Sequence, residues 1–204
     1  MTLWFLARAA GLMTLLGATT AVCFGAWTSG WRTLGRAQSR EPRLLQQPAH
    51  RSVAVVTVAL LALHIALLVL DSHISLSLPG ALVPFTAGYR GVALGLGTLA
   101  AYCFAVVTLT GVLRGRLGGS ARAARWWRPV HALAYLAWPL ALAHGVLAGT
   151  DTRSTWALLL YAGSTLAVVV TVWARLSAEE RVAAGPLSVT RRRAQSRVPT
   201  LDRR

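Results

Sequence analysis

Histidine is the residue whose spacing in this sequence points most directly to chemistry. Four of the five histidines form two pairs, each within one largely apolar stretch: His50 and His64 are 14 residues apart, and His131 and His144 are 13 residues apart. At a rise of about 1.5 Å per residue, these separations correspond to about 21 and about 20 Å along a helix. Two helices that run in the same direction would therefore present imidazoles at two matched depths.

Two imidazoles that face each other from neighbouring helices can supply both axial ligands of one haem iron. The spacing predicts His50 with His131 at one haem and His64 with His144 at a second. An iron with two histidine ligands has no open position, which favours electron transfer over oxygen binding. A histidine at membrane depth is costly and usually has a functional partner. The alternatives are an interhelical hydrogen bond for the His64 and His144 pair and a plain interfacial position for His50.

Ideal helix geometry places only one of the two pairs on a shared face. Fourteen residues at about 100° each return to within about 40° of the starting direction, so His50 and His64 lie on one face. Thirteen residues leave His131 and His144 about 140° apart. Pro139 lies between these two, and we expect a kink or a local change of winding there.

The elements that must position the histidines are transmembrane helices. Hydrophobic residues make up 55% of the 204 residues and charged residues 13%, with a mean hydropathy of +0.53, whereas soluble domains carry about 25% charged residues. Five stretches are long enough to cross about 30 Å of hydrocarbon as helices. They are residues 3–27, 52–70, 91–113, 129–148 and 155–174.

The predicted fold is therefore an all-α integral membrane protein with a five-helix bundle. The bundle occupies residues 1–180, and residues 181–204 form a basic tail expected to be disordered in the cytoplasm. The first stretch is interpreted as a retained helix, since no basic residue precedes Leu3 and its apolar run exceeds the 7–15 residues usual in a signal peptide. Residues 71–89 are expected to form an irregular loop with at most a short interfacial turn, and His73 within it is expected to be solvated.

The distribution of arginine predicts the orientation in the membrane. The chain has no lysine, and 18 of its 21 basic residues lie in residues 28–51, 114–128 and 175–204. The opposite loops hold only Arg90 and Arg153, beside Asp71 and Asp151. By the positive-inside rule the N-terminus lies outside and the C-terminus in the cytoplasm. The net charge of +15 is thus topogenic, and no nucleic-acid partner is expected. Arginine without lysine, with abundant Ala, Gly and Leu, is typical of a GC-rich bacterial genome. The expected location is therefore the inner (plasma) membrane of a bacterium.

The two cysteines, Cys23 and Cys103, lie in different apolar stretches and form no CxxC motif. A disulfide framework, a zinc site, an iron–sulfur cluster and covalent haem attachment are therefore not expected.

The paired spacing, with His50-Arg51 opening one helix and Leu63-His64-Ile65 following, resembles the ferric reductase-like transmembrane domain. That superfamily includes NADPH oxidases, yeast ferric reductases and the haem-binding membrane subunit of the bacterial methionine sulfoxide reductase system. The segments Arg128-Pro129-Val130-His131 and Trp138-Pro139 through Ala143-His144-Gly145 are similar to its second haem-binding helix. The resemblance covers about residues 45–175. It implies two b-type haems held by the four paired histidines, an inner one (His50, His131) and an outer one (His64, His144), and movement of single electrons across the membrane.

The sequence departs from this family in two respects. Many relatives have six helices with histidines on the third and fifth, whereas here the histidines fall on the second and fourth of five, a shift that loss of the first helix would explain. No GxGxxG or other phosphate-binding loop occurs in the cytoplasmic segments. The chain is therefore expected to lack its own flavin and nicotinamide-nucleotide domains, and not to oxidise NADPH by itself. It would act as an oxidoreductase component that receives electrons from a cytoplasmic flavoprotein or quinol. The acceptor outside would be a ferric chelate, dioxygen or a protein.

Three arginines are candidate partners for haem propionates, because arginine forms strong charge-assisted bonds with carboxylates. Arg51 and Arg128 lie near the inner pair, and Arg90 lies near the outer pair; topogenic charge is the alternative for each. Two other functions are open. A transporter that uses intramembrane histidines for protons or metal ions would need acidic partners at depth, which the second to fifth stretches lack. A quinol-linked cytochrome b would carry the same haems with a different donor.

Overall fold

The computed structural model describes residues 2–33, 40–71, 76–117 and 121–195, and these residues form helices and their connections. The helices are α1 (Thr2–Thr33), α2 (Arg40–Leu70), α3 (Leu78–Leu82), α4 (Gly91–Leu117), α5 (Ala121–His131), α6 (Ala134–Ala148) and α7 (Thr155–Gln195). Within them, five segments are long and apolar enough to cross a membrane: Thr2–Ser29, Gln46–Leu70, Gly91–Arg114, Arg125–Ala148 and Thr155–Glu180. The prediction of an all-helical, multi-pass membrane protein is confirmed to this extent.

Helix α1 is the central element of the bundle. It packs against α2, α7 and α6, while α4 packs against α5, α6 and α2. Small residues on α1, among them Ala7, Ala18 and Ala26, are completely or almost completely buried, and such residues let neighbouring helices approach closely in a membrane. The first apolar stretch is thus an integral part of the packed structure.

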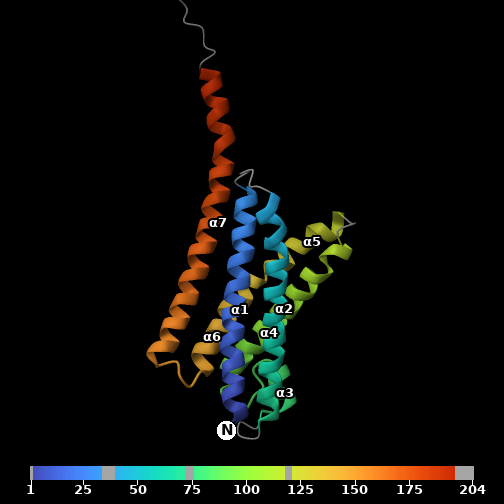
Figure 1. Cartoon of the computed structure of the whole chain (residues 1–204), viewed down its shortest axis with the longest axis vertical. Helices are drawn as coiled ribbons and strands as arrows, with labels where there is room; N and C mark the ends of the chain where they lie inside the picture. The colour runs from blue at the N-terminus through green and yellow to red at the C-terminus, as the bar shows by residue number, and fades with distance from the viewer. Residues whose placement is uncertain (1, 34–39, 72–75, 118–120, 196–204) are drawn as a thin grey trace, which may run out of the picture.

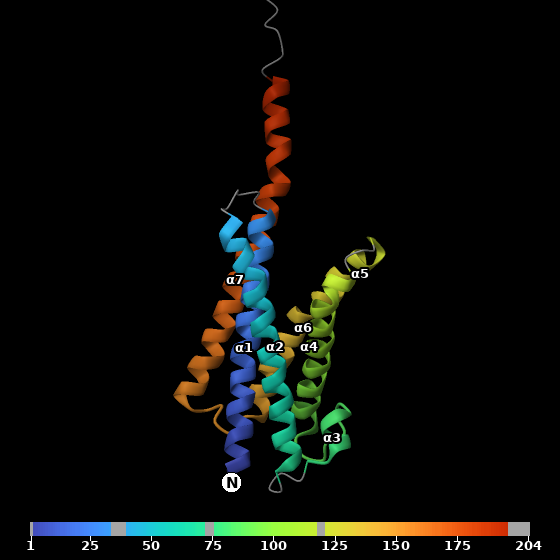
Figure 2. The same cartoon turned by 45° about the vertical axis from the view of Figure 1, so that its right-hand side comes forward.

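The two ends of the bundle are distinguished by the short helices that lie there. Helix α3 and the start of α1 lie at one end, called the α3 end below, and α5 lies at the other, called the α5 end (Figure 1). At the α5 end, α7 continues well beyond the bundle as a single helix (Figure 2). Helix α3 is the short turn expected in the loop; its N-cap is Ser77, whose side chain accepts a hydrogen bond from the Gly80 amide.

The fourth membrane-crossing segment is interrupted between α5 and α6. The amides of Leu133, Tyr135 and Leu136 bond carbonyls three residues earlier rather than four, which is 3₁₀ winding at about 120° per residue. An ideal helix from His131 to His144 falls about 140° short of four full turns, and overwinding reduces this deficit. Helix α6 itself runs through Pro139. The change of winding therefore lies in the turn before Pro139, because a proline ring clashes with the carbonyl four residues earlier.

Two helices extend beyond the apolar stretches that predict them. Helix α2 begins at Arg40, so that Pro48 and His50 lie inside it. Helix α7 is helical as far as Gln195, which differs from the disordered tail expected from residue 181, and residues 196–204 lie outside the described residues. The physical reason is that apolar length measures the membrane thickness, whereas residues with high helix propensity, such as Arg, Glu, Ala and Gln, continue a helix into water.

A hydrophobic layer fills the middle of the bundle between the two ends. Its buried members are Ala18, Val22, Ala100, Phe104, Ala137, Trp138 and Val168. The indole nitrogen of Trp138 donates a hydrogen bond of 2.9 Å to the Thr19 hydroxyl on α1. Both cysteines pack against this layer as free thiols.

Candidate functional site: two histidine pairs

The structure brings the four paired histidines together in the two combinations that their spacing predicts. His50 of α2 faces His131 at the end of α5, with ring centroids 6.2 Å apart and ring planes at 73°. His64 of α2 faces His144 of α6, with centroids 6.3 Å apart and planes at 76°. The first is called the α5-end pair and the second the α3-end pair.

The separation within each pair leaves room for one metal ion between the rings. Two imidazoles that bind one metal in line, each through a bond of about 2.0–2.1 Å, have ring centroids roughly 6 Å apart. Edge-to-face packing of two rings gives a similar separation, about 4.5–7 Å, with the ring planes at a steep angle. Both pairs therefore have a separation that suits either a shared metal ion or an edge-to-face ring contact.

At the α3-end pair, each histidine has a hydrogen-bond partner on a neighbouring helix. His64 Nδ1 lies 2.6 Å from the Ala7 carbonyl oxygen of α1, and His144 Nδ1 lies 2.8 Å from the Ala93 carbonyl oxygen of α4. A carbonyl only accepts, so each Nδ1 carries the proton and donates it. The lone pair of each ring is then on Nε2, and such a bond is the usual way in which proteins fix the orientation of a ligating histidine.

Glycines make room for both imidazoles of the α3-end pair. A Cβ added at Gly11 of α1 would lie 2.9 Å from His64 Cε1, and one added at Gly97 of α4 would lie 2.6 Å from His144 Nδ1. Real Cβ atoms almost never approach other atoms this closely. Each glycine follows the residue whose carbonyl accepts the hydrogen bond, Ala7 or Ala93, by four positions and so lies one helical turn further along the same face.

The α5-end pair repeats this arrangement with looser contacts. His50 faces the backbone of Ala21 on α1, and His131 faces that of Val107 on α4. Neither Nδ1 atom reaches hydrogen-bond geometry, and both are buried without a partner among the described residues. Gly25 and Gly111 again lie four positions after the facing backbone groups, with added Cβ atoms 3.4 and 3.5 Å from the His50 and His131 Cε1 atoms.

The position of these four glycines beside the histidines was not predicted from the sequence, which singled out only Gly97 among them, as a helix-packing residue; their spacing nevertheless carries a detectable signal. Gly11 and Gly25 on α1 are 14 residues apart, and so are Gly97 and Gly111 on α4. The interval equals that between His50 and His64. In an antiparallel bundle, a shared interval places two glycines level with two histidines on the facing helix.

A cavity of about 200 Å³ opens at the α3-end pair. His64 and His144 line it, and Gly11 and Gly97 lie beside them. Towards the end of the bundle its lining becomes polar, with Arg8, Arg90, Tyr89, Thr150 and Asp151. The rest of the wall is mainly apolar side chains of α1, α2, α4 and α7.

Arg90 is the propionate candidate that the structure places at this cavity. Its backbone is in the left-handed region, with φ 45°, a conformation that is strained for a residue with a side chain. Its guanidinium donates to the carbonyl oxygens of Leu147 and Ala148, at 2.9 and 3.1 Å, at the C-terminus of α6. A second arginine that the sequence did not single out, Arg8 of α1, lines the same cavity and is paired with Asp151.

The other predicted positions are less informative. Arg51 and Arg128 are exposed near the α5 end. His73 lies outside the described residues.

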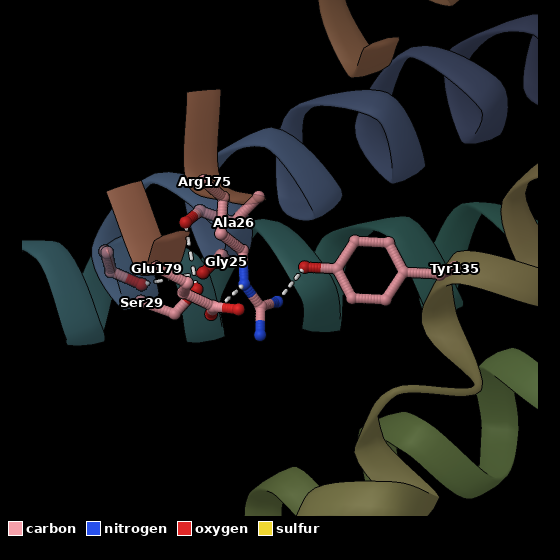
Figure 3. A network of polar contacts seen from close by, with 7 residues as sticks. Gly25, Ala26, Ser29, Tyr135, Arg175 and Glu179 are labelled. Atoms are coloured by element: carbon pink, nitrogen blue, oxygen red, sulfur yellow. Dashed lines mark hydrogen bonds and ion pairs between the residues drawn. The ribbon is translucent and has the colours of Figure 1, made fainter. Parts of the chain in front are cut away.

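Aromatic and charged side chains surround the α5-end pair. The Trp127 ring is stacked on His131, with centroids 4.8 Å apart and planes at 20°, and the Arg114 guanidinium lies 4.1 Å from the Trp127 ring centroid. On the other side of the bundle, Arg175 of α7 donates to the Tyr135 hydroxyl at 2.5 Å and to Glu179 at 3.2 Å. Figure 3 shows Arg175 reaching from α7 towards Tyr135, with Gly25 of α1 close by. This network ties α7 to α6 next to the helix turn that carries His131.

Within the described part of the chain, no group of three or more His, Cys, Asp or Glu side chains could hold a metal ion. The two histidine pairs thus offer two protein ligands each. No family model, curated protein or solved structure matches this sequence.

Proposed function

We propose that this protein transfers electrons across a membrane through two b-type haems, one held by His64 and His144 and the other by His50 and His131. The observation that carries the proposal is the geometry of the two pairs. Both have facing imidazoles at a metal-bridging separation, 6.2 and 6.3 Å between centroids, at two levels about 20 Å apart along the helices.

The chain's residues fit a haem at the α3-end pair. His64 and His144 offer Nε2 lone pairs, Gly11 and Gly97 provide clearance, and the cavity between them ends at Arg8 and Arg90. Guanidinium groups there suit the carboxylates of haem propionates. When bound, a haem supplies an iron that accepts and releases one electron.

The protein itself holds the imidazoles and excludes water. The carbonyls of Ala7 and Ala93 fix the Nδ1–H tautomer of the α3-end pair, which also makes each ring a better electron donor to a metal. The hydrophobic layer around Phe104 and Trp138 separates the two pairs. Electrons would therefore pass between two fixed sites while ions and water do not.

Two ligands per site favour haem over a bare metal ion. Zinc and similar ions held by side chains take three or four protein ligands, and each pair supplies two. In haem the porphyrin occupies the remaining positions of the iron, so two axial histidines complete it. This difference in ligand number makes a metal-ion transporter the weaker alternative.

The arginine distribution supports a cytoplasmic α5 end. The segments 28–51, 114–128 and 175–204, which adjoin this end, hold 18 of the 21 basic residues, and cytoplasmic loops carry such an excess. The N-terminus would then face outwards, and the C-terminus would face the cytoplasm of a bacterial cell. A basic cytoplasmic face would also attract an acidic electron donor, such as a flavoprotein. We infer a ferric reductase-like membrane subunit from the histidine spacing and this orientation.

The first experiment is to count haems in the purified full-length chain. We expect red protein with two b-type haems per polypeptide by the pyridine haemochrome assay, and a Soret band that shifts on reduction with dithionite. A colourless protein after expression with excess haem precursor would refute the proposal. One haem per chain would refute the two-site form and leave a single-site cytochrome.

The direction of transfer is tested in oriented proteoliposomes. An impermeant reductant at the cytoplasmic face should reduce an impermeant ferric chelate on the other side, and His64→Ala should abolish this transfer. Equal rates in the variant and the parent would exclude a two-haem path. Transfer in the opposite direction from a quinol donor would indicate a quinol-linked cytochrome instead.

A further inference from the structure

Trp127 and Arg114 form a stacked column on one side of the α5-end pair. The Trp127 ring lies almost parallel to the His131 ring, with planes at 20° and centroids 4.8 Å apart. The Arg114 guanidinium lies 4.1 Å from the centroid of the same Trp127 ring. Trp127 therefore contacts both the His131 imidazole, by stacking, and the Arg114 guanidinium, by a cation–π contact.

The column has features that packing alone does not require. Trp127 is half-buried, and its indole nitrogen is buried without a hydrogen-bond partner among the described residues, whereas buried tryptophans usually satisfy this group. Its neighbour Trp126 is 66% exposed, as expected of an interfacial anchor. The two adjacent tryptophans thus have different environments, and only Trp127 contacts a histidine.

We propose that Trp127 and Arg114 are positioning residues that raise the reduction potential of the α5-end site through His131. This inference rests on the proposed function, since it concerns a haem at that site. Reduction removes one positive charge from the iron. A fixed positive charge nearby opposes the oxidised form more than the reduced form, so Arg114 favours the reduced form. The indole keeps water from one face of His131, and a less hydrated site also favours the less charged, reduced form.

Among the residues that the structure describes, no aromatic ring other than the partner imidazole is paired with His64 or His144, whose Nδ1 atoms are instead bonded to the Ala7 and Ala93 carbonyls. A carbonyl acceptor makes the imidazole a stronger donor, which favours the oxidised iron. The column therefore acts at one site of the two, and the other site serves as an internal reference in the same molecule.

The test is an equilibrium redox titration of the purified full-length chain, repeated in a His64→Ala background that retains only the α5-end haem. Arg114→Gln removes the charge, and Trp127→Leu removes the stacked ring. For each we expect a lower midpoint potential at this haem, with a roughly threefold to tenfold change in the ratio of oxidised to reduced iron, or about 30–60 mV for one electron. Arg114→Lys and Trp127→Phe keep the charge and the ring, so they should restore most of the original potential.

The matched controls lie on α5, the short helix that carries Trp127. Arg125→Gln removes an equal charge from an exposed position, and Trp126→Leu removes an exposed indole; neither should move the potential. Because Arg114 is itself exposed, high salt should shrink the difference between Arg114→Gln and the parent.

The outcomes separate this inference from the proposed function. A parent chain without haem overturns both. Two haems with an unchanged α5-end potential in Arg114→Gln and Trp127→Leu overturn the column alone. An equal shift at both haems would also overturn it, since that would be a general effect of charge or folding.

Discussion

The two histidine pairs have the same design but differ in how firmly the surrounding helices hold them. At the α3 end, both Nδ1 atoms are hydrogen-bonded to carbonyls, and a Cβ added at either glycine would lie only 2.6 or 2.9 Å from an imidazole atom. At the α5 end, the Nδ1 atoms have no partner among the described residues, and a Cβ added at the corresponding glycines would lie 3.4 and 3.5 Å from the imidazoles. The α3-end pair is a tight site built from backbone. The α5-end pair is a looser one, flanked by Trp127 and Arg114.

The difference shows that equal spacing along two helices does not create two equal sites. The α5-end pair lies beside the interruption between α5 and α6, where the chain changes from 3₁₀ to α winding. Helix α4 can therefore approach α6 closely at Gly97 but leaves more room at Gly111.

Loss of a single ligand should have the largest effect. His64→Ala and His144→Ala should each remove the α3-end haem and keep the other, because each iron depends on one imidazole from each helix. His50→Ala and His131→Ala should do the reverse. The measurement is haem per polypeptide, which should fall from two to one in all four variants. Two haems retained in any one variant would contradict the pairing at that site.

Glycine substitutions should separate the tight site from the loose one. Gly97→Ala places a methyl group 2.6 Å from His144, so we expect about 10–100-fold weaker haem binding at the α3 end. Gly111→Ala, at 3.5 Å from His131, should leave haem binding nearly unchanged. The control is Gly163→Ala on α7, where an added Cβ meets nothing within 4 Å. Equal losses in Gly97→Ala and Gly111→Ala would argue against the contrast between the two pairs.

The two haems should also differ in midpoint potential. The Nδ1 bonds of the α3-end pair favour oxidised iron, and Arg114 near the α5-end pair favours reduced iron. At the α3-end cavity Arg8 is neutralised by Asp151, whereas Arg90 acts in the same sense as Arg114. We expect the Nδ1 bonds to outweigh Arg90, so the α3-end haem should have the lower potential. Redox titration of His64→Ala and His50→Ala, each with one haem, assigns the two values. Identical potentials, or the reverse order, would count against this reading of the Nδ1 bonds. Outward transfer would still proceed, because an inside-negative membrane potential contributes about 2.3 kcal/mol per electron per 100 mV.

The smallest effect is expected in the layer between the pairs. Thr19→Val removes the acceptor of the 2.9 Å bond from the Trp138 indole. We expect a loss of about 1 kcal/mol in stability, measured as a lower unfolding temperature in detergent, with both haems and both potentials retained. A change in either potential would mean that this layer belongs to one of the sites.

The sequence predicted an all-helical membrane protein and the pairing of the four histidines because both depend on properties of single helices. Apolar length indicates a membrane span whatever its neighbours are, and the 14- and 13-residue intervals follow from helical rise. The same reasoning placed helix ends poorly: α2 begins at Arg40 and α7 continues to Gln195, because hydropathy does not measure where a helix stops. It also predicted a kink or a local change of winding between His131 and His144, and the 3₁₀ turn before Pro139 is such a change.

The roles of Gly11, Gly97, Ala7 and Ala93 were decided only by the tertiary structure. The spacing of the glycines is visible in the sequence. Whether these glycines face a histidine depends on the rotation and vertical register of α1 and α4 against α2 and α6. The same holds for Trp127, which contacts His131, and Trp126, which does not. One helix's periodicity is local, whereas the distance between two helices is set by all the side chains packed between them. The pairing of the four histidines could therefore be predicted from the sequence, and the groups that contact them could not.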